Sequence, residues 1–297
     1  MMNILITGGT GLIGKALTEN LQQKGHIVRV LSRKPEGDEF YWNLKEKKID
    51  DAAFENLDCI IHLAGATISQ RWTDDYRKEM FASRVNAAKL LKDYCLKNNV
   101  HLDSFISASG INYYGTLTSD EILDEKSGVI KADFLAKLCV DWEKAADDFS
   151  DISDRVVCLR TAMVFAKDGG AFPLLEKTVA LNIGSAVGSG KQWMNWIHLD
   201  DLVNMYVFAV ENPEVNGKFN AVADDIPTNR EFMKKLAKSK EKFFLPLNVP
   251  AFLLQTVLGD MSSIILEGTR ASNKKIKSLG FDFNYSTLKE AFKSLVY

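Results

Sequence analysis

The sequence has little excess of charge of either sign. Its 37 lysines and arginines nearly balance 39 acidic residues, so the formal net charge is −2. Nucleic-acid binding needs a basic surface, and this balance argues against a nucleic-acid partner. Long hydrophobic runs are also missing, because no apolar stretch approaches the ~20 residues that a membrane-spanning helix requires. With no basic and apolar leader-like stretch either, we expect a cytoplasmic protein without a membrane partner.

Cysteine is scarce, and the four cysteines lie far apart. Cys59, Cys95, Cys139 and Cys158 form no C-x-x-C pair. Two of them, Cys59 and Cys158, fall in expected core strands. The pattern predicts reduced, packed thiols, and we expect neither disulfides nor a metal site.

The most informative feature that is present is a glycine-rich turn near the N-terminus. The apolar run Met2–Ile6 stops at this turn, and a helical pattern follows from Leu12 to Lys24. Glycines 9, 11 and 14 match the dinucleotide fingerprint, which requires a tight turn, close approach of the backbone to a pyrophosphate, and close helix packing. Phosphates would lie at the helix N-terminus. The residues expected around them are Gly8, Thr10, Gly11, Leu12, Ile13 and Gly14.

Short apolar runs alternate with helical patterns through the first half of the chain. Expected strands are Ile4–Thr7, Ile27–Ser32, Asp58–Leu63, Ser104–Ser109 and Val156–Leu159. Expected helices are Leu12–Lys24, Tyr76–Asn98 and Phe134–Phe149. This alternation predicts an α/β fold, a Rossmann-type doubly wound parallel sheet with helices on both faces. Ligands of such sheets lie beyond the carboxyl ends of the strands, so we expect the site in the loops that follow them.

The end of the second strand distinguishes between the two dinucleotides. NAD-binding chains normally place Asp or Glu there, but this chain has Ser32-Arg33-Lys34. A guanidinium can pair with a 2′-phosphate, which a carboxylate would repel. The sequence therefore favours NADP(H), with Arg33 on the 2′-phosphate. In the alternative interpretation, Arg33 and Lys34 are a solvated strand end.

The alternation weakens after about residue 165. Loops are expected at Ala166–Gly170 and Gly184–Lys191, a helix at Leu199–Glu211, a strand at Lys218–Val222 and mostly helices from Thr228 onward. The strongly apolar segment 245–258 is expected to have a small core of its own. We divide the chain into an NADP-binding domain at 1–225, in which 166–195 contributes to the substrate cleft, and a small, mostly helical C-terminal lobe at 226–297 on the substrate side.

Several separated motifs resemble those of the extended short-chain dehydrogenase/reductases, the superfamily of nucleotide-sugar epimerases and dehydratases. They are Thr7–Gly14, Ile61–Ala66 and Ile106–Gly115. The motifs Arg71-Trp72-Thr73, Ser83-Arg84-Val85, Trp196–Leu202 and Gly280–Tyr285 are similar to an atypical subgroup, the epimerase family proteins. The C-terminal segment of unknown function in that subgroup is similar to Val249–Phe292. The resemblance covers most of the chain.

The resemblance implies a Tyr-x-x-x-Lys pair on a helix, with a Ser or Thr nearby. Lys137 is the best-placed lysine, but Asp133 holds the tyrosine position. Asp133 would need a large upward pKa shift to donate a proton, and is otherwise a helix N-cap before Phe134. Lys137 either holds the ribose or lies on a solvated helix face.

Hydroxyl groups near the end of the fourth strand are further candidates for chemistry. Ser107 and Ser109 either reach a substrate oxygen or the nicotinamide amide, or satisfy backbone groups. Tyr113 or Tyr114, in the next loop, either supplies the missing phenol or packs as a loop aromatic. The candidate catalytic residues are Ser109, Tyr114 and Lys137. The further candidate cofactor contacts are Leu63, Ala64, Gly65, Ser107 and Lys137.

Two side chains are candidates for the substrate. Arg84 lies on the helix expected to border the nicotinamide, where it either binds an anionic substrate or forms a surface pair. Trp193 lies beside glycines in a loop and is the tryptophan best placed to line a pocket, whereas Trp72 and Trp196 are core residues by default. His198, in apolar surroundings, is interpreted as structural.

These observations favour an NADP(H)-dependent oxidoreductase or epimerase-like enzyme that acts on a small carbonyl or hydroxyl substrate. The alternative is an NADP(H)-binding sensor or scaffold without turnover, which the missing tyrosine supports. Nucleotide-sugar epimerisation or dehydration comes third, because it also requires the tyrosine. Superfamily members often pair through helices like 76–98 and 134–149, so a homodimer stays open beside a monomer.

Overall fold

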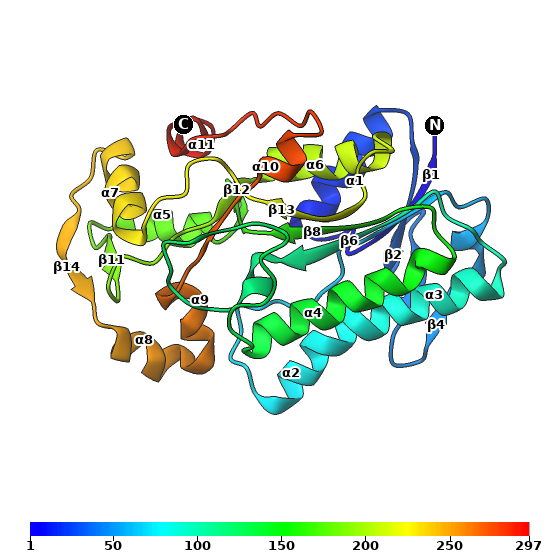
Figure 1. The fold of residues 1–297 in the computed structure, drawn as a ribbon, viewed down its shortest axis with the longest axis horizontal. Coiled ribbons are helices and arrows are strands. Elements are labelled where there is room, and N and C mark those ends of the chain that lie inside the picture. Colours follow the sequence, from blue (N-terminus) through cyan, green and yellow to red (C-terminus); the bar gives the residue numbers. More distant parts are fainter. Residues whose placement is uncertain (297) are drawn as a thin grey trace.

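An eight-stranded sheet forms the centre of the computed structural model, which describes residues 1–296 (Figure 1). Its strands are β1 (Asn3–Thr7), β2 (Ile27–Ser32), β3 (Phe40–Asn43), β4 (Lys48–Ile49), β5 (Cys59–His62), β6 (Ser104–Gly110), β8 (Val156–Thr161) and β13 (Gly217–Ala221). They are ordered β13-β8-β6-β5-β1-β2-β3-β4, and every pair is parallel except β3 with β4. The predicted fold class is confirmed, although the sequence pattern did not predict β3 and β4.

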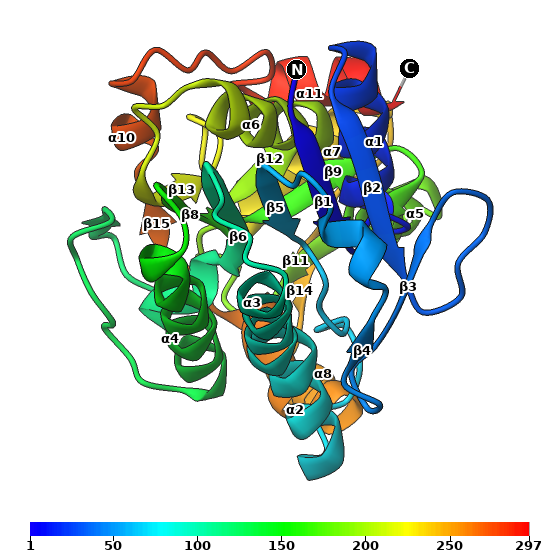
Figure 2. The ribbon, with the colours of Figure 1, turned by 90° about the vertical axis from the view of Figure 1, so that its right-hand side faces the viewer.

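Helices cover both faces of the sheet (Figure 2). One face carries α1 (Leu12–Gln23) and α6 (Leu199–Glu211), and the other carries α3 (Ala87–Lys97) and α4 (Phe134–Asp147). Alternate residues of β1 serve the two cores: Ile4 and Ile6 pack with α1 and α6, whereas Leu5 packs with the opposite core. Burial on both faces explains why the parallel strands are nearly continuous apolar runs.

The helix expected at 76–98 is interrupted. It consists of α2 (Asp74–Phe81), the π-helical turn η2 (Ala82–Asn86) and α3. Thr73 caps the start of α2 by accepting a hydrogen bond from the backbone N–H of Tyr76. Single π-helical turns within α-helices occur frequently at functional sites, and this one lies against the loop that follows β5, because Ser83 and Arg84 both bond to Ala66.

The rest of the chain contains short strands and helices outside the main sheet. They are η1 (Asp51–Phe54), η3 (Ile111–Tyr114), β7 (Ile122–Leu123), η4 (Asp148–Asp151), β9 (Met163–Ala166), β10 (Gly169–Gly170), α5 (Phe172–Ala180), β11 (Ser185–Val187), β12 (Trp196–His198), α7 (Asn229–Ser239), β14 (Leu245–Val249), α8 (Ala251–Leu258), η5 (Gly259–Ser262), α9 (Ser263–Leu266), β15 (Arg270–Ala271), α10 (Lys274–Lys277) and α11 (Leu288–Val296). The strands β10 and β11 lie in segments expected to be loops. Phe172, Phe232 and Phe292 join α5, α7 and α11 in a third core.

The expectation that 245–258 builds its own small core is wrong. No residue of α8 is buried, and Leu247, Phe252 and Val257 are 83%, 63% and 73% exposed. The segment lies at the edge of the molecule, where β14 pairs with β11 in a two-stranded sheet (Figure 1). Apolar composition leads to burial only where another element covers it. Within residues 1–296, no helix is long and apolar enough to cross a membrane.

Candidate cofactor and substrate site

The turn between β1 and α1 is closely packed on three sides. Gly8 has a φ of +72°, and a Cβ atom there would lie 3.0 Å from the backbone of Ala64. A Cβ on Gly9 would lie 2.6 Å from the Val30 side chain of β2, and one on Gly14 would lie 2.2 Å from the carbonyl oxygen of Gly8. A side chain at any of these three positions would collide with its neighbour, so each position requires glycine. The close approach at Gly14 places the start of α1 directly on the turn.

The same turn leaves the first N–H groups of α1 available. Gly11 is the N-cap, no side chain caps the helix, and its first turn has no acidic residue. Thr10 and Gly11 are exposed, and the nearest atom to a Cβ built on Gly11, apart from its chain neighbours, is the Gly8 oxygen at 3.3 Å. The structure thus brings the six residues predicted from the fingerprint into one cradle, which is exposed at Thr10 and Gly11. Uncapped N–H groups at the positive end of a helix dipole fit the phosphates of a dinucleotide.

A buried histidine that sequence reasoning missed fixes the neighbouring loop. His62 Nδ1 lies 2.8 Å from Thr7 Oγ1, and His62 Nε2 lies 3.0 Å from the carbonyl oxygen of Arg84. Because a carbonyl only accepts, Nε2 carries the proton, and Nδ1 accepts from the Thr7 hydroxyl. Thr7 Oγ1 in turn accepts from the N–H of Ala64 at 3.1 Å. Burial lowers the pKa of His62 to about 4, so the ring is neutral at pH 7.

This network holds the candidate cofactor residues Leu63, Ala64 and Gly65 beside the glycine cradle. The signal for it in the sequence is that Thr7 and His62 end neighbouring strands, and they face each other in the register of β1 and β5.

Arg84 also stabilises the loop that follows β5. Its guanidinium donates to the carbonyl oxygens of Ala66 (2.9 Å) and Met80 (3.1 Å), and its carbon lies 4.9 Å from the centre of the Trp142 ring. A Cβ on Gly65 would lie 2.9 Å from that guanidinium. The buried side chain is therefore not placed as the anion-binding or surface-pairing group that we expected, because its helix face packs against α4 and the loop.

Two predicted hydroxyl groups belong to a buried network. Ser109 donates to Glu143 (2.8 Å), and Arg160 donates to both carboxylate oxygens of Glu143 and to the hydroxyl of Tyr114 (3.1 Å). The Tyr114 hydroxyl also lies 2.8 Å from the carbonyl oxygen of Asp124, and burial raises the pKa of Tyr114. Tyr114 is therefore not placed to supply the missing phenol to a substrate.

Tyr113 and Ser107 are the two remaining candidates near the end of β6. Tyr113 is half-buried, and the carbon of the Arg160 guanidinium lies 3.4 Å from the centre of its ring. Ser107 is buried and bonds to the carbonyl oxygen of Ala108 at 2.9 Å.

Asp133 is the N-cap of α4. Its carboxylate accepts from the N–H of Ala136 (3.0 Å) and from the N–H and hydroxyl of Thr116 (2.6 and 2.5 Å). Burial alone would raise the pKa of Asp133, but these hydrogen bonds outweigh it and lower the pKa. Asp133 is thus ionised at neutral pH and is not a proton donor. Lys137 is exposed one turn further along α4, which is compatible with both interpretations of it.

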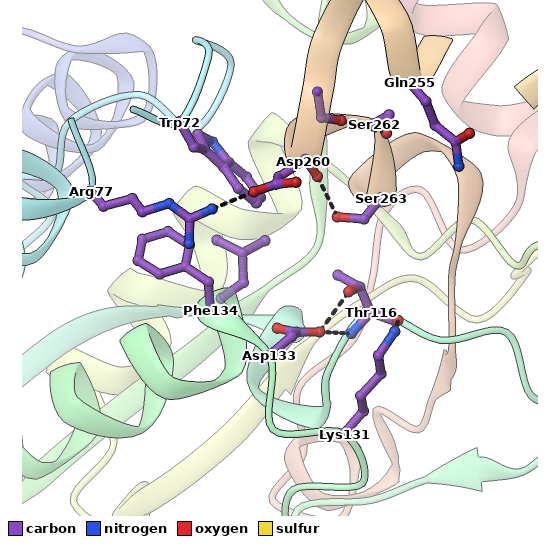
Figure 3. Close-up of a pocket in the computed structure, with 12 residues that line it drawn as sticks. Trp72, Arg77, Thr116, Lys131, Asp133, Phe134, Gln255, Asp260, Ser262 and Ser263 are labelled. Atoms are coloured by element: carbon purple, nitrogen blue, oxygen red, sulfur yellow. Dashed lines mark hydrogen bonds and ion pairs between the residues drawn. The ribbon is translucent and has the colours of Figure 1, made fainter. Parts of the chain in front are cut away.

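A cavity of ≈ 600 Å³ lies where three parts of the chain meet (Figure 3). Its lining residues are Trp72, Arg77, Thr116, Lys131, Asp133, Phe134, Leu135, Gln255, Gly259, Asp260, Ser262 and Ser263. Trp193 does not line it: the indole N–H donates to Asp120 (3.1 Å), and Arg270 lies over the ring. Trp196 is a fully buried core residue. The aromatic wall of the cavity thus comes from Trp72 and Phe134.

The parallel sheet and the glycine cradle define a Rossmann-type nucleotide-binding protein. Residues 4–222 match the NAD dependent epimerase/dehydratase family, and the chain belongs to that family. Residues 249–295 match a domain of unknown function (DUF1731). The resemblance predicted from the motifs is confirmed.

Proteins of the same kind match over the whole chain. Epimerase family protein YfhF of Bacillus subtilis (strain 168) is 34% identical over 302 residues, which cover 99% of this chain and 98% of that protein. Epimerase family protein SH2119 of Staphylococcus haemolyticus is 32% identical over 310 residues, with 100% and 99% covered. The crystal structure of human epimerase family protein SDR39U1 with NADPH is 30% identical, has a TM-score of 0.89 and covers 99% of both chains.

Proposed function

We propose that this chain binds NADP(H) in the glycine cradle and acts as an oxidoreductase or epimerase-like enzyme on a small carbonyl or hydroxyl compound. The observation that carries the proposal is the uncapped N-terminus of α1, packed against the turn by Gly14. The bound nucleotide would supply hydride transfer. The chain would bind its phosphates with the N–H groups of α1 and position the nicotinamide with the loop that His62 and Thr7 hold.

The choice of NADP(H) over NAD(H) rests on the end of β2. Arg33 is exposed there, directly after the strand that pairs with β1. No acidic residue stands at positions 32–34, so nothing in that stretch repels a 2′-phosphate. The structure of the human relative with NADPH supports the same choice.

A second candidate function is NADP(H) binding without turnover, as in a sensor or scaffold. The specific observation in its favour is that Asp133 stands at the tyrosine position of the superfamily with a lowered pKa. Tyr114, the other candidate acid, is buried and bonded to protein groups. Neither Asp133 nor Tyr114 is thus placed to act as the usual proton donor of the reaction.

The test compares cofactor binding by wild type and Arg33→Glu. We expect Arg33→Glu to weaken NADPH binding by roughly ten- to hundredfold, the effect of losing a charge-assisted pair, and to change NADH binding little. Lys89→Glu is the matched control, because it makes the same charge change at an exposed position of α3. Equal losses for both cofactors would refute the assignment of Arg33.

Turnover is tested separately by following NADPH absorbance with aldehydes, ketones, quinones and sugar nucleotides. Oxidation by a member of the panel supports the enzyme. Thermal stabilisation by NADPH without turnover on any member favours the second candidate.

A further inference from the structure

Arg77 presents a guanidinium to the cavity from α2, seven residues before Arg84 (Figure 3). The guanidinium carbon lies 4.5 Å from the centre of the Phe134 ring and 5.9 Å from the Trp72 ring. Aromatic faces fix the plane of an arginine side chain and favour its positive charge. Arg77 is thus held at the aromatic wall, but its side chain remains 28% exposed.

The carboxylate that faces Arg77 is weakly held. Asp260 Oδ2 accepts from Arg77 Nη2 at 2.5 Å, and the Asp260 side chain is 73% exposed. Among residues 1–296, this is the only hydrogen bond of either the carboxylate or the guanidinium. A guanidinium has five N–H donors, so four of those of Arg77 are without a protein acceptor. Asp133, across the cavity, differs because three donors fix its carboxylate.

The segment that carries Asp260 is also lightly packed. Asp260 lies in η5, directly after α8, and none of the residues of α8 is buried. Exposed ion pairs are weak, so moving this carboxylate away from Arg77 costs little. The charged groups then left around the cavity are Arg77, Lys131 and Asp133, with one net positive charge.

We propose that Arg77 binds an oxyanion group of the substrate, a carboxylate or a phosphate, and that Asp260 occupies its place in this structure. The inference rests on the proposed function, since it names the substrate class of the same cavity. An incoming carboxylate or phosphate makes two parallel hydrogen bonds with the guanidinium, whereas Asp260 makes one. The planar part of such a substrate lies against Trp72, and binding releases Asp260.

The test titrates NADPH-saturated protein, whose cofactor phosphate sites are filled, with benzoate, inorganic phosphate and neutral benzamide in a calorimeter. We expect at least one of the two anions to bind at least tenfold more tightly than benzamide. Arg77→Gln should weaken anion binding at least tenfold, and Asp260→Asn should strengthen it several-fold. The two variants thus have opposite effects, which misfolding does not produce. Benzoate binding without phosphate binding identifies a carboxylate substrate, and the reverse identifies a phosphate.

Matched controls come from the neighbouring exposed ion pair of Lys78 and Asp75 on α2. Lys78→Gln and Asp75→Asn make the same charge changes and should leave anion affinity within twofold of wild type. The inference is overturned if anion affinity is unchanged in Arg77→Gln or in Asp260→Asn. It is also overturned if neither wild type nor Asp260→Asn binds an anion. In each case NADPH binding by the same proteins would still uphold the proposed function. If wild type binds no NADPH, the proposed function fails, and the same titration without cofactor still decides the role of Arg77.

Discussion

Glu143 of α4 and Arg160 of β8 form an ion pair that is more deeply buried than any other among residues 1–296. The two side chains are 5% and 3% exposed, and two hydrogen bonds of 2.8 and 2.9 Å join them. Burial alone would lower the pKa of Arg160, but the hydrogen bonds that Arg160 donates to the Glu143 carboxylate raise it, so the guanidinium stays charged. Removing the negative partner would therefore leave a buried, unpaired charge.

Glu143→Gln keeps the shape of the side chain and removes its charge. Breaking a buried pair on one side costs about 3–5 kcal/mol of unfolding free energy. The unfolding entropy of globular proteins, about 2.1 cal/mol/K per residue, converts this loss into a fall of roughly 5–8 °C in Tm for a chain of 297 residues. In the double variant Glu143→Gln with Arg160→Met both charges are gone, and we expect most of the stability to return.

The assay is urea and thermal unfolding of the three proteins, with Asp147→Asn as the control. Asp147 lies one turn further along α4 and pairs with the half-buried Lys218, but its own side chain is 54% exposed, so its substitution should cost less than about 1 kcal/mol. If Glu143→Gln is as stable as this control, or the double variant is no more stable than Glu143→Gln, the pair is not desolvated as the structure indicates.

Two further predictions concern the cofactor cradle. The pKa of His62 is about 4 in the folded protein and about 6.5 in the unfolded chain. Between these pH values the unfolded chain binds a proton on His62 that the folded protein does not bind. The free energy of unfolding should therefore fall by up to about 3 kcal/mol as the pH drops from 6.5 to 4. Urea unfolding across this range measures how the unfolding free energy depends on pH. This part of the pH dependence should be missing in His62→Gln, and an identical pH dependence in both proteins would contradict the prediction. Gly14→Ala, whose Cβ would lie 2.2 Å from the Gly8 oxygen, should lower both Tm and NADPH affinity. Gly11→Ala, with no contact closer than 3.3 Å, should lower NADPH affinity and leave Tm nearly unchanged, and a Tm loss equal to that of Gly14→Ala would refute this.

The arrangement of the candidate cofactor residues could be predicted because its determinants are local. The glycine turn, the strand end at Arg33 and the loop after β5 each follow a strand that its own apolar pattern predicts. In a parallel sheet, the carboxyl ends of neighbouring strands meet at one edge. Residues as far apart as Gly8 and Ala64 therefore come together without any knowledge of side-chain packing.

The substrate side could not be predicted in the same way, because its contacts depend on which helix face packs where. An arginine on a helix usually lies at the surface, but Arg84 is buried and its guanidinium packs against Gly65. Ser109 ends a strand like a substrate-binding hydroxyl, but its hydroxyl donates a hydrogen bond to Glu143, 34 residues later. The partners Arg77 and Asp260 are 183 residues apart, and no periodicity in the sequence connects them.

The position of Asp133 shows why a complete cradle does not by itself establish turnover. A carboxylate with a lowered pKa is a poor proton donor at pH 7, and it is a weak base for the same reason. The three hydrogen bonds that lower this pKa also make Asp133 the cap of α4 and its link to Thr116. Asp133 therefore has a structural role at the start of α4. Any proton transfer in this cavity has to come from another group, and the absorbance assay decides whether one exists.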